Sequence, residues 1–405
     1  MTPRADTGTD AKASAQPSVC HVFMSKLANE SRLEKEIGFL RTHGFDGPVQ
    51  VLGVADADVV VSPTLHQMAQ VRLFSPEAPL RRIPIVGKLL RFRRWATQVR
   101  AALRQRDNTI VVAHSLPAFV VCSALNKLSG RLIYDAHEYE TERNGFRPWQ
   151  KRLARLAEGL CIGKASEVWA VSPSIVDAYR TRYPHVPARL IMNLPPRPLP
   201  DVTDPDIRAR LNIPPDRLVC GYLGALGPGR CIELYLDTFA KLWESRTADR
   251  NTVPDLVIVG DGVLRSRCEQ AAAKFPNIHY LPPVPPDQVV AAARHFDIGL
   301  CLIDPSSLSY KYSLPNKFFQ HLSAGNFTIV LDASTDMLRF APDDNRILTT
   351  QADTLSQAIG AATQAHARNA ATSFASDKSY FWEDQTPQLH AAFADLPLNP
   401  AQAPA

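Results

Sequence analysis

Short apolar runs alternate with longer amphipathic segments along most of the chain from residue 18 onward. Apolar runs of about 4–8 residues between turn residues are typical of buried strands, and apolar residues three or four apart are typical of helices. In the first half of the chain we expect strands at 18–24, 49–54, 108–114, 131–137, 167–171 and 189–193. We expect helices at 31–44, 116–128, 148–164 and directly after Ser172. This alternation predicts a parallel sheet with helices on both faces.

The same alternation starts again after residues 193–206, a segment that holds five prolines and few apolar residues. A stiff, polar segment of this kind marks a domain boundary. Beyond it we expect strands at 217–224, 255–260, 277–281, 297–303 and 327–332, and helices at 231–245, 263–274, 286–295, 315–325 and 380–396. The predicted fold class is therefore α/β, with two Rossmann-like doubly wound domains that face each other across a cleft. Ligands bind at the carboxyl ends of the strands in such sheets.

The expected organisation follows from these elements. We expect a disordered tail (1–17), a first domain (18–195), a second domain (196–378), a last helix (379–396) and a second disordered tail (397–405).

The composition of 405 residues, with 45% hydrophobic and 21% charged residues, is that of an ordinary globular protein and excludes a disordered or fibrous chain. No run of about 18 apolar residues is present, and the first 17 residues lack the apolar core of a secretory signal. The seven cysteines stand singly. This spacing excludes a disulfide framework and a zinc site and favours reduced core cysteines in a cytoplasmic protein.

The net charge of +5 is unevenly distributed, because Arg72–Arg106 holds ten basic residues and one acidic residue. Large apolar residues, among them Phe92 and Trp95, lie between them. A helix of this composition is suited to an anionic membrane surface, and we favour that interpretation. The alternative is a solvated helix whose apolar stripe packs on the core. Nucleic-acid binding is disfavoured, since no known nucleic-acid motif accompanies the charge.

Neither a G-x-x-x-x-G-K-[ST] motif nor a G-x-G-x-x-G motif after the first strand is present, so the chain has no Walker or ordinary dinucleotide site. GALGPGR (224–230) instead connects a predicted strand to a helix, where backbone amides, a helix N-terminus and Arg230 favour an anion. A plain tight turn is an equal alternative. For GDG (260–262) a structural turn capped by Asp261 is the favoured interpretation.

In SLPNKFFQHLSAG (313–325), Pro315 suits the first turn of a helix and would place Asn316 and Lys317 at its positive end. Two cations and two helix ends in one domain suit a diphosphate, although a surface lysine is the alternative for Lys317. His114 and His137 both end predicted strands, which favours a role in the cleft over buried structural histidines.

Acidic residues supply less information. Glu138, Glu140 and Glu142 follow His137, and clustered acids most often form a solvated face. Asp56-Ala57-Asp58 has the spacing of a metal motif but lies beside an apolar strand, and we assign it no metal.

Several segments, taken in order, resemble bacterial glycosyltransferase family 4, whose members are retaining enzymes with the two-domain GT-B fold. In the first domain they are SRLEKEIGFLRTHGF, AHSLPAFV, IYDAHEYE, EVWAVSPS and RLIMNLP; in the second they are YLGALGPGR, LVIVGDG, DIGLCL, SLPNKFFQHLSAG and FWEDQ. The resemblance covers roughly residues 18–395. It implies a GT-B fold and sugar transfer, and it does not specify the sugar.

The resemblance also implies roles for single residues. Catalysis would fall to His114, Arg230 and Lys317. Donor binding would involve Gly224, Ala225, Gly260, Asn316 and Gln320. Acceptor binding would involve Arg32, His137 and Glu138, and Trp382 and Glu383 would belong to a final segment that crosses back to the first domain.

Three positions depart from the family pattern. Two glutamates separated by seven residues are usual, and Tyr312 and Gln320 stand in their places. Gln320 keeps an acceptor oxygen for a ribose hydroxyl but loses the charge that strengthens such a bond. Cys231 stands where the family tends to have glycine.

These observations together predict a retaining, metal-independent glycosyltransferase without a cofactor. It would move a sugar from a nucleoside diphosphate sugar to a lipid-linked or polysaccharide acceptor, in surface polysaccharide biosynthesis. Its expected location is cytoplasmic, on the inner face of the plasma membrane, with no nucleic-acid partner. A GT-B nucleotide-sugar epimerase and a non-catalytic scaffold of a polysaccharide assembly complex are the alternatives.

Overall fold

The computed structural model describes residues 17–27, 30–55, 60–74, 84–104, 109–125, 130–199, 202–245, 253–372, 378 and 380–399. Most of the expected N-terminal tail (1–16) and residues 400–405 lie outside this part of the chain. So do Asp56 and Asp58, and three residues of the basic segment, Arg81, Arg82 and Arg106.

In the first half of the described chain, seven parallel strands form one sheet in the order β3-β2-β1-β4-β5-β6-β7. The strands are β1 (Ser18–Phe23), β2 (Val49–Val54), β3 (Gln70–Phe74), β4 (Thr109–His114), β5 (Leu132–Ala136), β6 (Glu167–Ala170) and β7 (Ala188–Leu190). The helices are α1 (Ser31–Thr42), α2 (Pro63–Met68), α3 (Pro84–Leu103), α4 (Ser115–Ser123), α5 (Pro148–Cys161) and α6 (Pro173–Arg182), with 3-10 turns η1 (Glu140–Glu142) and η2 (Ile162–Lys164). β1 pairs with both β2 and β4, so the strand order reverses at this point and opens a crevice at the carboxyl ends.

The second half of the described chain repeats the plan with six parallel strands in the order β10-β9-β8-β11-β12-β13. They are β8 (Val219–Leu223), β9 (Asp255–Val259), β10 (Ile278–Leu281), β11 (Ile298–Leu300), β12 (Phe327–Leu331) and β13 (Ile347–Thr350). The helices are α7 (Ile207–Arg210), α8 (Ile232–Glu244), α9 (Arg265–Lys274), α10 (Val289–Ala293), α11 (Leu308–Lys311), α12 (Asn316–Ser323), α13 (Thr335–Leu338) and α14 (Leu355–Thr372), with 3-10 turns η3 (Pro286–Gln288) and η4 (Ala352–Thr354).

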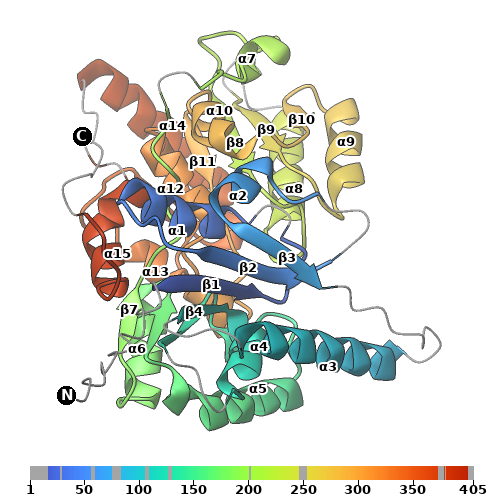
Figure 1. Ribbon diagram of the computed structural model, residues 1–405. Helices are drawn as coiled ribbons and strands as arrows, with labels where there is room; N and C mark the ends of the chain where they lie inside the picture. Colours follow the sequence, from blue (N-terminus) through green and yellow to red (C-terminus); the bar gives the residue numbers. More distant parts are fainter. Residues whose placement is uncertain are drawn as a thin grey trace, which may run out of the picture.

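Every strand expected from the sequence is present, within a few residues of its predicted ends. The prediction of two doubly wound α/β domains is confirmed. Figure 1 shows the two sheets as separate layers, with the blue-to-green one below and the yellow-to-orange one above.

The end of the chain packs on the first half. The expected single helix over 380–396 is a 3-10 turn, η5 (Trp382–Gln385), followed by α15 (Thr386–Ala392), because Pro387 suits only the first turn of a helix. Leu389 and Phe393 are fully buried in a core that also holds Trp169 of β6. Figure 1 shows α15 (red) beside β7 and α1. Residues 397–399, expected in the second disordered tail, are described, and Leu398 packs against this core.

Cys20, Cys122, Cys220, Cys268 and Cys301 are buried and Cys161 and Cys231 are partly buried, and none of these seven described cysteines forms a disulfide. Within the described residues, no helix is both long and apolar enough to cross a membrane.

Candidate active site

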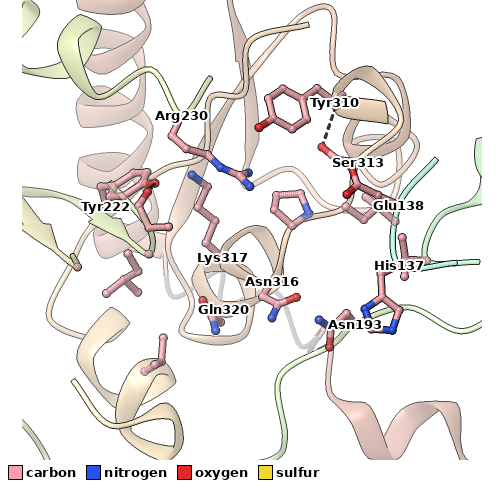
Figure 2. A pocket seen from close by; sticks show the side chains of 18 of the residues that line it. His137, Glu138, Asn193, Tyr222, Arg230, Tyr310, Ser313, Asn316, Lys317 and Gln320 are labelled. Atoms are coloured by element: carbon pink, nitrogen blue, oxygen red, sulfur yellow. Dashed lines mark hydrogen bonds between the residues drawn. The ribbon is translucent and has the colours of Figure 1, made fainter. Parts of the chain in front are cut away.

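A cleft of about 760 Å³ lies between the two halves of the molecule and is lined from both. It lies at the carboxyl ends of the strands, where doubly wound sheets bind ligands. Ten of the eleven residues that the sequence singled out line it: Arg32, His137, Glu138, Gly224, Ala225, Arg230, Gly260, Asn316, Lys317 and Gln320. Figure 2 shows Arg230 and Lys317 on one side and His137 with Asn193 on the other.

Glycines allow two loops of the second half to touch beneath the cleft. Gly224, after β8, has φ +129°, and a Cβ atom on Gly260, after β9, would lie 1.9 Å from the carbonyl oxygen of Gly224. The loops are joined by a hydrogen bond of 2.8 Å from the Leu226 amide to the Asp261 carbonyl oxygen. Asp261 also accepts from the amide of Gly262 with its side chain, which agrees with a structural turn at GDG. The loops therefore need glycine for their close approach.

Cys231 precedes α8 with φ +55°, a backbone conformation that favours glycine. This geometry explains why glycine suits the position. In this chain Cys231 adopts that backbone conformation without being a glycine. The neighbouring Arg230 lies with its guanidinium 5.4 Å from the centre of the Tyr310 ring.

Lys317 is the most unusual side chain of the cleft. Its Nζ atom is buried and forms no hydrogen bond with any described residue. It lies 4.1 Å from the centre of the Tyr222 ring, a cation–π contact. Burial, together with the nearby charge of Arg230, lowers the pKa of Lys317 to about 8. The surface-lysine alternative is therefore wrong.

Helix α12 aims its positive end at the same region. It begins at Asn316 directly after Pro315, and the first N–H groups of a helix have no partner inside the helix. Asn316 and Gln320 face the cleft one turn apart (Figure 2). Tyr312, the other departure from the family pattern, instead stacks on Tyr139 of the first half at a centroid distance of 6.3 Å. Of the two departures, Gln320 therefore lines the cleft, and Tyr312 contacts the first half of the chain.

Across the cleft, a buried polar network connects α1 with three strands. Arg32 donates two hydrogen bonds to the Asp135 carboxylate, at 2.8 and 2.7 Å, and one to the Ile191 carbonyl oxygen. Glu36, one turn after Arg32, has one carboxylate oxygen 3.0 Å from its Nε. His114 Nδ1 lies 2.9 Å from the same Asp135. These groups hold the end of β5 against α1.

Two carboxyls of this network have opposite pKa shifts. Although burial opposes it, the Arg32 guanidinium holds the pKa of Asp135 well below its usual range. Burial, together with the Asp135 charge, raises the pKa of Glu36 well above its usual range. Burial also lowers the pKa of His114 to about 4. We therefore expect Asp135 to be the ionised partner of Arg32 and Glu36 to be protonated.

His114 is the one singled-out residue that does not line the cleft. Its ring is buried, stacked on Phe23 at 3.8 Å between centroids, and its Nε2 lies 3.0 Å from Nδ1 of His21. Its Nδ1 lies 2.9 Å from Nε2 of His137, whose side chain is 28% exposed. His137 is thus the histidine that faces the cleft, and His114 lies behind it.

The clustering of the acidic residues after His137 favoured a solvated face, and for two of them, Glu140 and Glu142, this interpretation is wrong. Glu140 and Glu142 are 2% and 3% exposed. Burial raises the pKa of Glu140 to about 7, and Glu142 pairs with Arg155 and Lys151 of α5. Glu138 accepts hydrogen bonds across the cleft from Ser309 at 3.0 Å, and pairs with Arg143 at 2.8 Å. The two acidic side chains of η1 therefore lie inside the first half and not on its surface.

Two groups in the described chain have the spacing of a metal site, His21 with Glu36 and His114, and His114 with Asp135 and His137. Arg32 already donates to both oxygens of Asp135, which places a fixed positive charge where a cation would bind. The raised pKa of Glu36 disfavours the negative charge that a cation would require in the other group. The residues therefore fit a hydrogen-bonded network better than a metal.

Several residues of the cleft were not singled out in the sequence. Asn193 lies at the start of the proline-rich segment and accepts from Lys35 Nζ at 2.5 Å. Tyr222, Ser309 and Tyr310 complete the wall around Lys317 and Glu138. Tyr222 belongs to a strand of apolar residues, so the sequence pattern predicted a place in the core for it. Ser309 and Tyr310 belong to α11, which is too short to show a helical periodicity.

Comparison with known proteins supports the fold. Residues 49–197 match the model of a family described as a glycosyl transferase 4-like domain. No curated protein matches the sequence at a significant level.

Solved structures match over nearly the whole chain. Sucrose-phosphate synthase from Thermosynechococcus elongatus has a TM-score of 0.67 at 14% identity, covering 94% of this chain and 99% of its own. HepE of Anabaena, in complex with UDP and glucose, has a TM-score of 0.65 at 16% identity, covering 93% and 99%. WaaG, a glycosyltransferase involved in lipopolysaccharide biosynthesis, has a TM-score of 0.60 at 13% identity, covering 92% of this chain and 99% of its own.

The fold is of the GT-B type. Likeness at this level of identity establishes the fold and leaves the activity to the residues of the cleft.

Proposed function

We propose that the protein is a retaining, metal-independent glycosyltransferase that moves a sugar from a nucleoside diphosphate sugar to a lipid-linked or polysaccharide acceptor. Surface polysaccharide biosynthesis is the proposed setting. The observation that carries the proposal is the buried Lys317 ammonium, which has no hydrogen-bond partner among the described residues and lies in the cleft with Arg230. A buried charge of this kind needs an anion to offset its desolvation, and a diphosphate supplies one.

The chemistry follows from where charge develops. When the bond from the sugar to the diphosphate breaks, negative charge grows on the leaving phosphate oxygens. Cations and amide dipoles already in place stabilise that charge without reorganising. Lys317, Arg230 and the N-terminus of α12 would act in this way. Retention would follow if the acceptor attacks from the face that the diphosphate leaves, with a diphosphate oxygen taking its proton.

The first half would bind the acceptor. His137 and Glu138 line the cleft opposite the two cations and would contact the acceptor hydroxyls. Asp135, 3.0 Å from Nε2 of His137, would orient the ring, and His114 would support it from behind. In this proposal His114 and Arg32 are positioning residues, since their polar atoms are engaged within the network.

Calorimetric titration with UDP, GDP, ADP and CMP, with and without EDTA, tests the donor half of the proposal. We expect one diphosphate to bind and its affinity to survive EDTA. Binding that EDTA abolishes would contradict the metal-independent mechanism, and no binding of any of the four would contradict the assignment of Lys317 and Arg230.

Gln320 favours one alternative, a scaffold that binds the nucleotide without turnover, because an amide replaces the charged ribose acceptor of related enzymes. Incubating candidate nucleotide sugars with and without acceptor separates the possibilities. Conversion only with acceptor supports the transferase, conversion without it supports an epimerase, and nucleotide binding without any conversion supports the scaffold.

Peripheral attachment to an anionic membrane on the cytoplasmic side is part of the proposal. Trp95, Val99 and Leu103 of α3 pack in the core of the first half, so the apolar residues there serve the fold. Lys88, Arg91 and Arg93 are exposed in the N-terminal half of α3 together with Leu89, which is 58% exposed. The C-terminal half of α3 therefore packs on the core, and we propose the exposed N-terminal half for the membrane contact.

A further inference from the structure

Helix α5 has its apolar face turned to solvent. Trp149, Leu153, Leu156 and Leu160, which we name the α5 stripe, are 59%, 58%, 60% and 76% exposed. Their spacing of four, three and four residues places them on one side of the helix, over about 16 Å of its length. These four are among only ten large hydrophobic side chains exposed in the described chain, so they concentrate on one helix what is otherwise scattered.

The inward face of α5 explains how this orientation is held. Glu158 is the one fully buried residue of the helix, all of which is described. Its carboxylate accepts hydrogen bonds from three tyrosine hydroxyls, Tyr134 at 3.2 Å, Tyr179 at 2.8 Å and Tyr183 at 3.1 Å. Small residues, Ala154 and Cys161, pack beside it against the core.

The arrangement is inverted relative to an ordinary surface helix, whose apolar stripe faces the core. Because Glu158 has three partners inside, rotating α5 to bury the leucines would strip a carboxylate of its hydrogen bonds. The fold therefore keeps the α5 stripe at the surface, where contacts within this chain do not bury it.

The charges around the α5 stripe are of one sign. Lys151, Arg152 and Arg155 lie on the helix and Arg147 directly before it, while the buried Glu158 is its one acidic residue. Lys151 and Arg155 also contact Glu142 at the inner edge, which fixes their positions beside the stripe. A Trp and three leucines flanked by arginines are the composition of a helix that lies in the interface of an anionic bilayer.

Helix α5, which carries the stripe, lies on the same side of the first sheet as α3. Helix α4 packs against both α3 and α5, and Figure 1 shows the three helices together along one side of the first sheet. The exposed Leu89 and the arginines of α3 thus extend one basic and apolar surface.

We propose that the α5 stripe inserts into the headgroup region of an anionic membrane, with α3 supplying long-range attraction. This inference rests on the proposed function in one respect, that the protein works at a membrane, and it assigns the hydrophobic part of that contact to a helix for which no binding role was expected. A membrane seated on α3 and α5 would present lipid-linked acceptors to the first half of the protein.

The test measures partition of the full-length protein onto vesicles of phosphatidylglycerol and phosphatidylcholine by co-sedimentation at low and near-physiological salt. The variant Leu153→Gln/Leu156→Gln should bind at least about tenfold more weakly at both salt concentrations, because apolar insertion is insensitive to screening. Leu199→Gln/Val263→Gln, which changes residues 72% and 79% exposed elsewhere, is the matched control and should bind as the unaltered protein does. Arg91→Gln/Arg93→Gln should lose binding mainly at low salt.

Tryptophan fluorescence supplies a second readout. Trp149 should shift to shorter wavelength on vesicle addition, and Trp149→Phe should remove that shift, since Trp95, Trp169 and Trp382 are buried and the half-buried Trp243 belongs to α8 of the second half. Unchanged partition of the leucine variant would overturn the inference. So would a lipid-free dimer of the unaltered protein that the leucine variant converts to monomer, because a second copy would then cover the stripe.

The same variants separate this inference from the proposed function. UDP titration of Leu153→Gln/Leu156→Gln should match the unaltered protein, because none of the four stripe residues lines the cleft. Vesicle binding without nucleotide binding would contradict the transferase and leave the α5 stripe standing; nucleotide binding without vesicle binding would do the reverse.

Discussion

At the scale of single residues, the cleft is defined by one ammonium group that the fold leaves without an anion. Lys317 lies between Tyr222 and Arg230, and the described chain gives its Nζ atom no hydrogen bond. Desolvating a charge without a partner is unfavourable, and binding sites are where proteins tolerate it. Burial and the lack of an anionic partner make the Lys317 charge unfavourable in the free protein. The same two features strengthen its attraction to a bound diphosphate.

Lys317→Ala should lower turnover at least ~100-fold with the donor identified by titration, as removing one preorganised donor to a developing charge does in other enzymes. Initial rates at saturating donor and acceptor measure this. Lys311→Ala is the control and should retain turnover, because it changes an exposed lysine of α11, the helix that precedes the α12 helix of Lys317. Near-normal turnover in Lys317→Ala would contradict the site.

The affinity for UDP should fall as pH rises through about 8, the pKa of Lys317. The free site is protonated below that value and neutral above it, so binding a diphosphate above it requires proton uptake. By linkage this weakens binding by up to about tenfold per pH unit. Titrations between about pH 7 and about pH 9.5 measure the slope. Lys317→Ala should bind weakly with no such slope, and an unchanged slope in that variant would show that another group titrates.

At the scale of elements, the first half is organised by the network that ties α1 to β4 and β5. We expect Asp135, at the end of β5, to be the ionised partner of the buried Arg32 and Glu36 to be protonated, because their pKa values are shifted in opposite directions. The two carboxyls lie close together and yet differ in charge. Their removal should therefore have different consequences.

Asp135→Asn should destabilise the protein by about 3–5 kcal/mol, because it leaves a buried guanidinium without its charge partner. Glu36→Gln should cost less than about 1 kcal/mol, because an amide resembles the protonated acid in shape and charge. Chemical unfolding followed by tryptophan fluorescence compares them. Equal losses of unfolding free energy would mean that Glu36 is ionised.

Elements without a strong periodic pattern were the ones that the sequence did not predict. β3 is an edge strand whose five residues are mostly exposed or half-buried, and it contains Arg72, the first residue of the basic segment. α14 is rich in alanine and carries few large apolar residues. Both are specified by what they pack against, β2 for the strand and β12 and β13 for the helix, and a local pattern does not contain that information.

At the scale of the whole molecule, contacts between distant segments join the two halves. Asp336 of α13 accepts hydrogen bonds from the Ser174 amide, at 3.1 and 3.2 Å, and from its hydroxyl at 2.8 Å. A carboxylate of the second half thereby caps α6 of the first. At the chain end, Gln385 bonds both the amide and the carbonyl of Met192, and Phe393 packs edge-on against Trp169 at 5.3 Å. The last residues thus complete a core built by the first.

Phe393→Ala should lower the free energy of unfolding by about 3–5 kcal/mol, because it opens a cavity in the core of the first half. Thermal unfolding of the full chain measures the loss, and Phe393→Leu should recover most of it. A loss below about 1 kcal/mol would mean that α15 contributes little to the stability of the first half.

The sequence by itself determined the strand and helix order, the two-domain α/β class and ten of the residues that line the cleft. The order and the class depend on local periodicity and on glycines and prolines at strand ends, which a one-dimensional pattern records, and the cleft residues follow largely from the resemblance to a known family. The tertiary structure decided which of two neighbouring histidines faces the cleft, which acids are buried, and that Lys317 lacks an anion. It also decided that α5 turns its leucines outward, because Glu158 finds its three tyrosines only once β5 and α6 are in place. Such outcomes depend on which side chains from distant segments meet, and only packing in three dimensions fixes that.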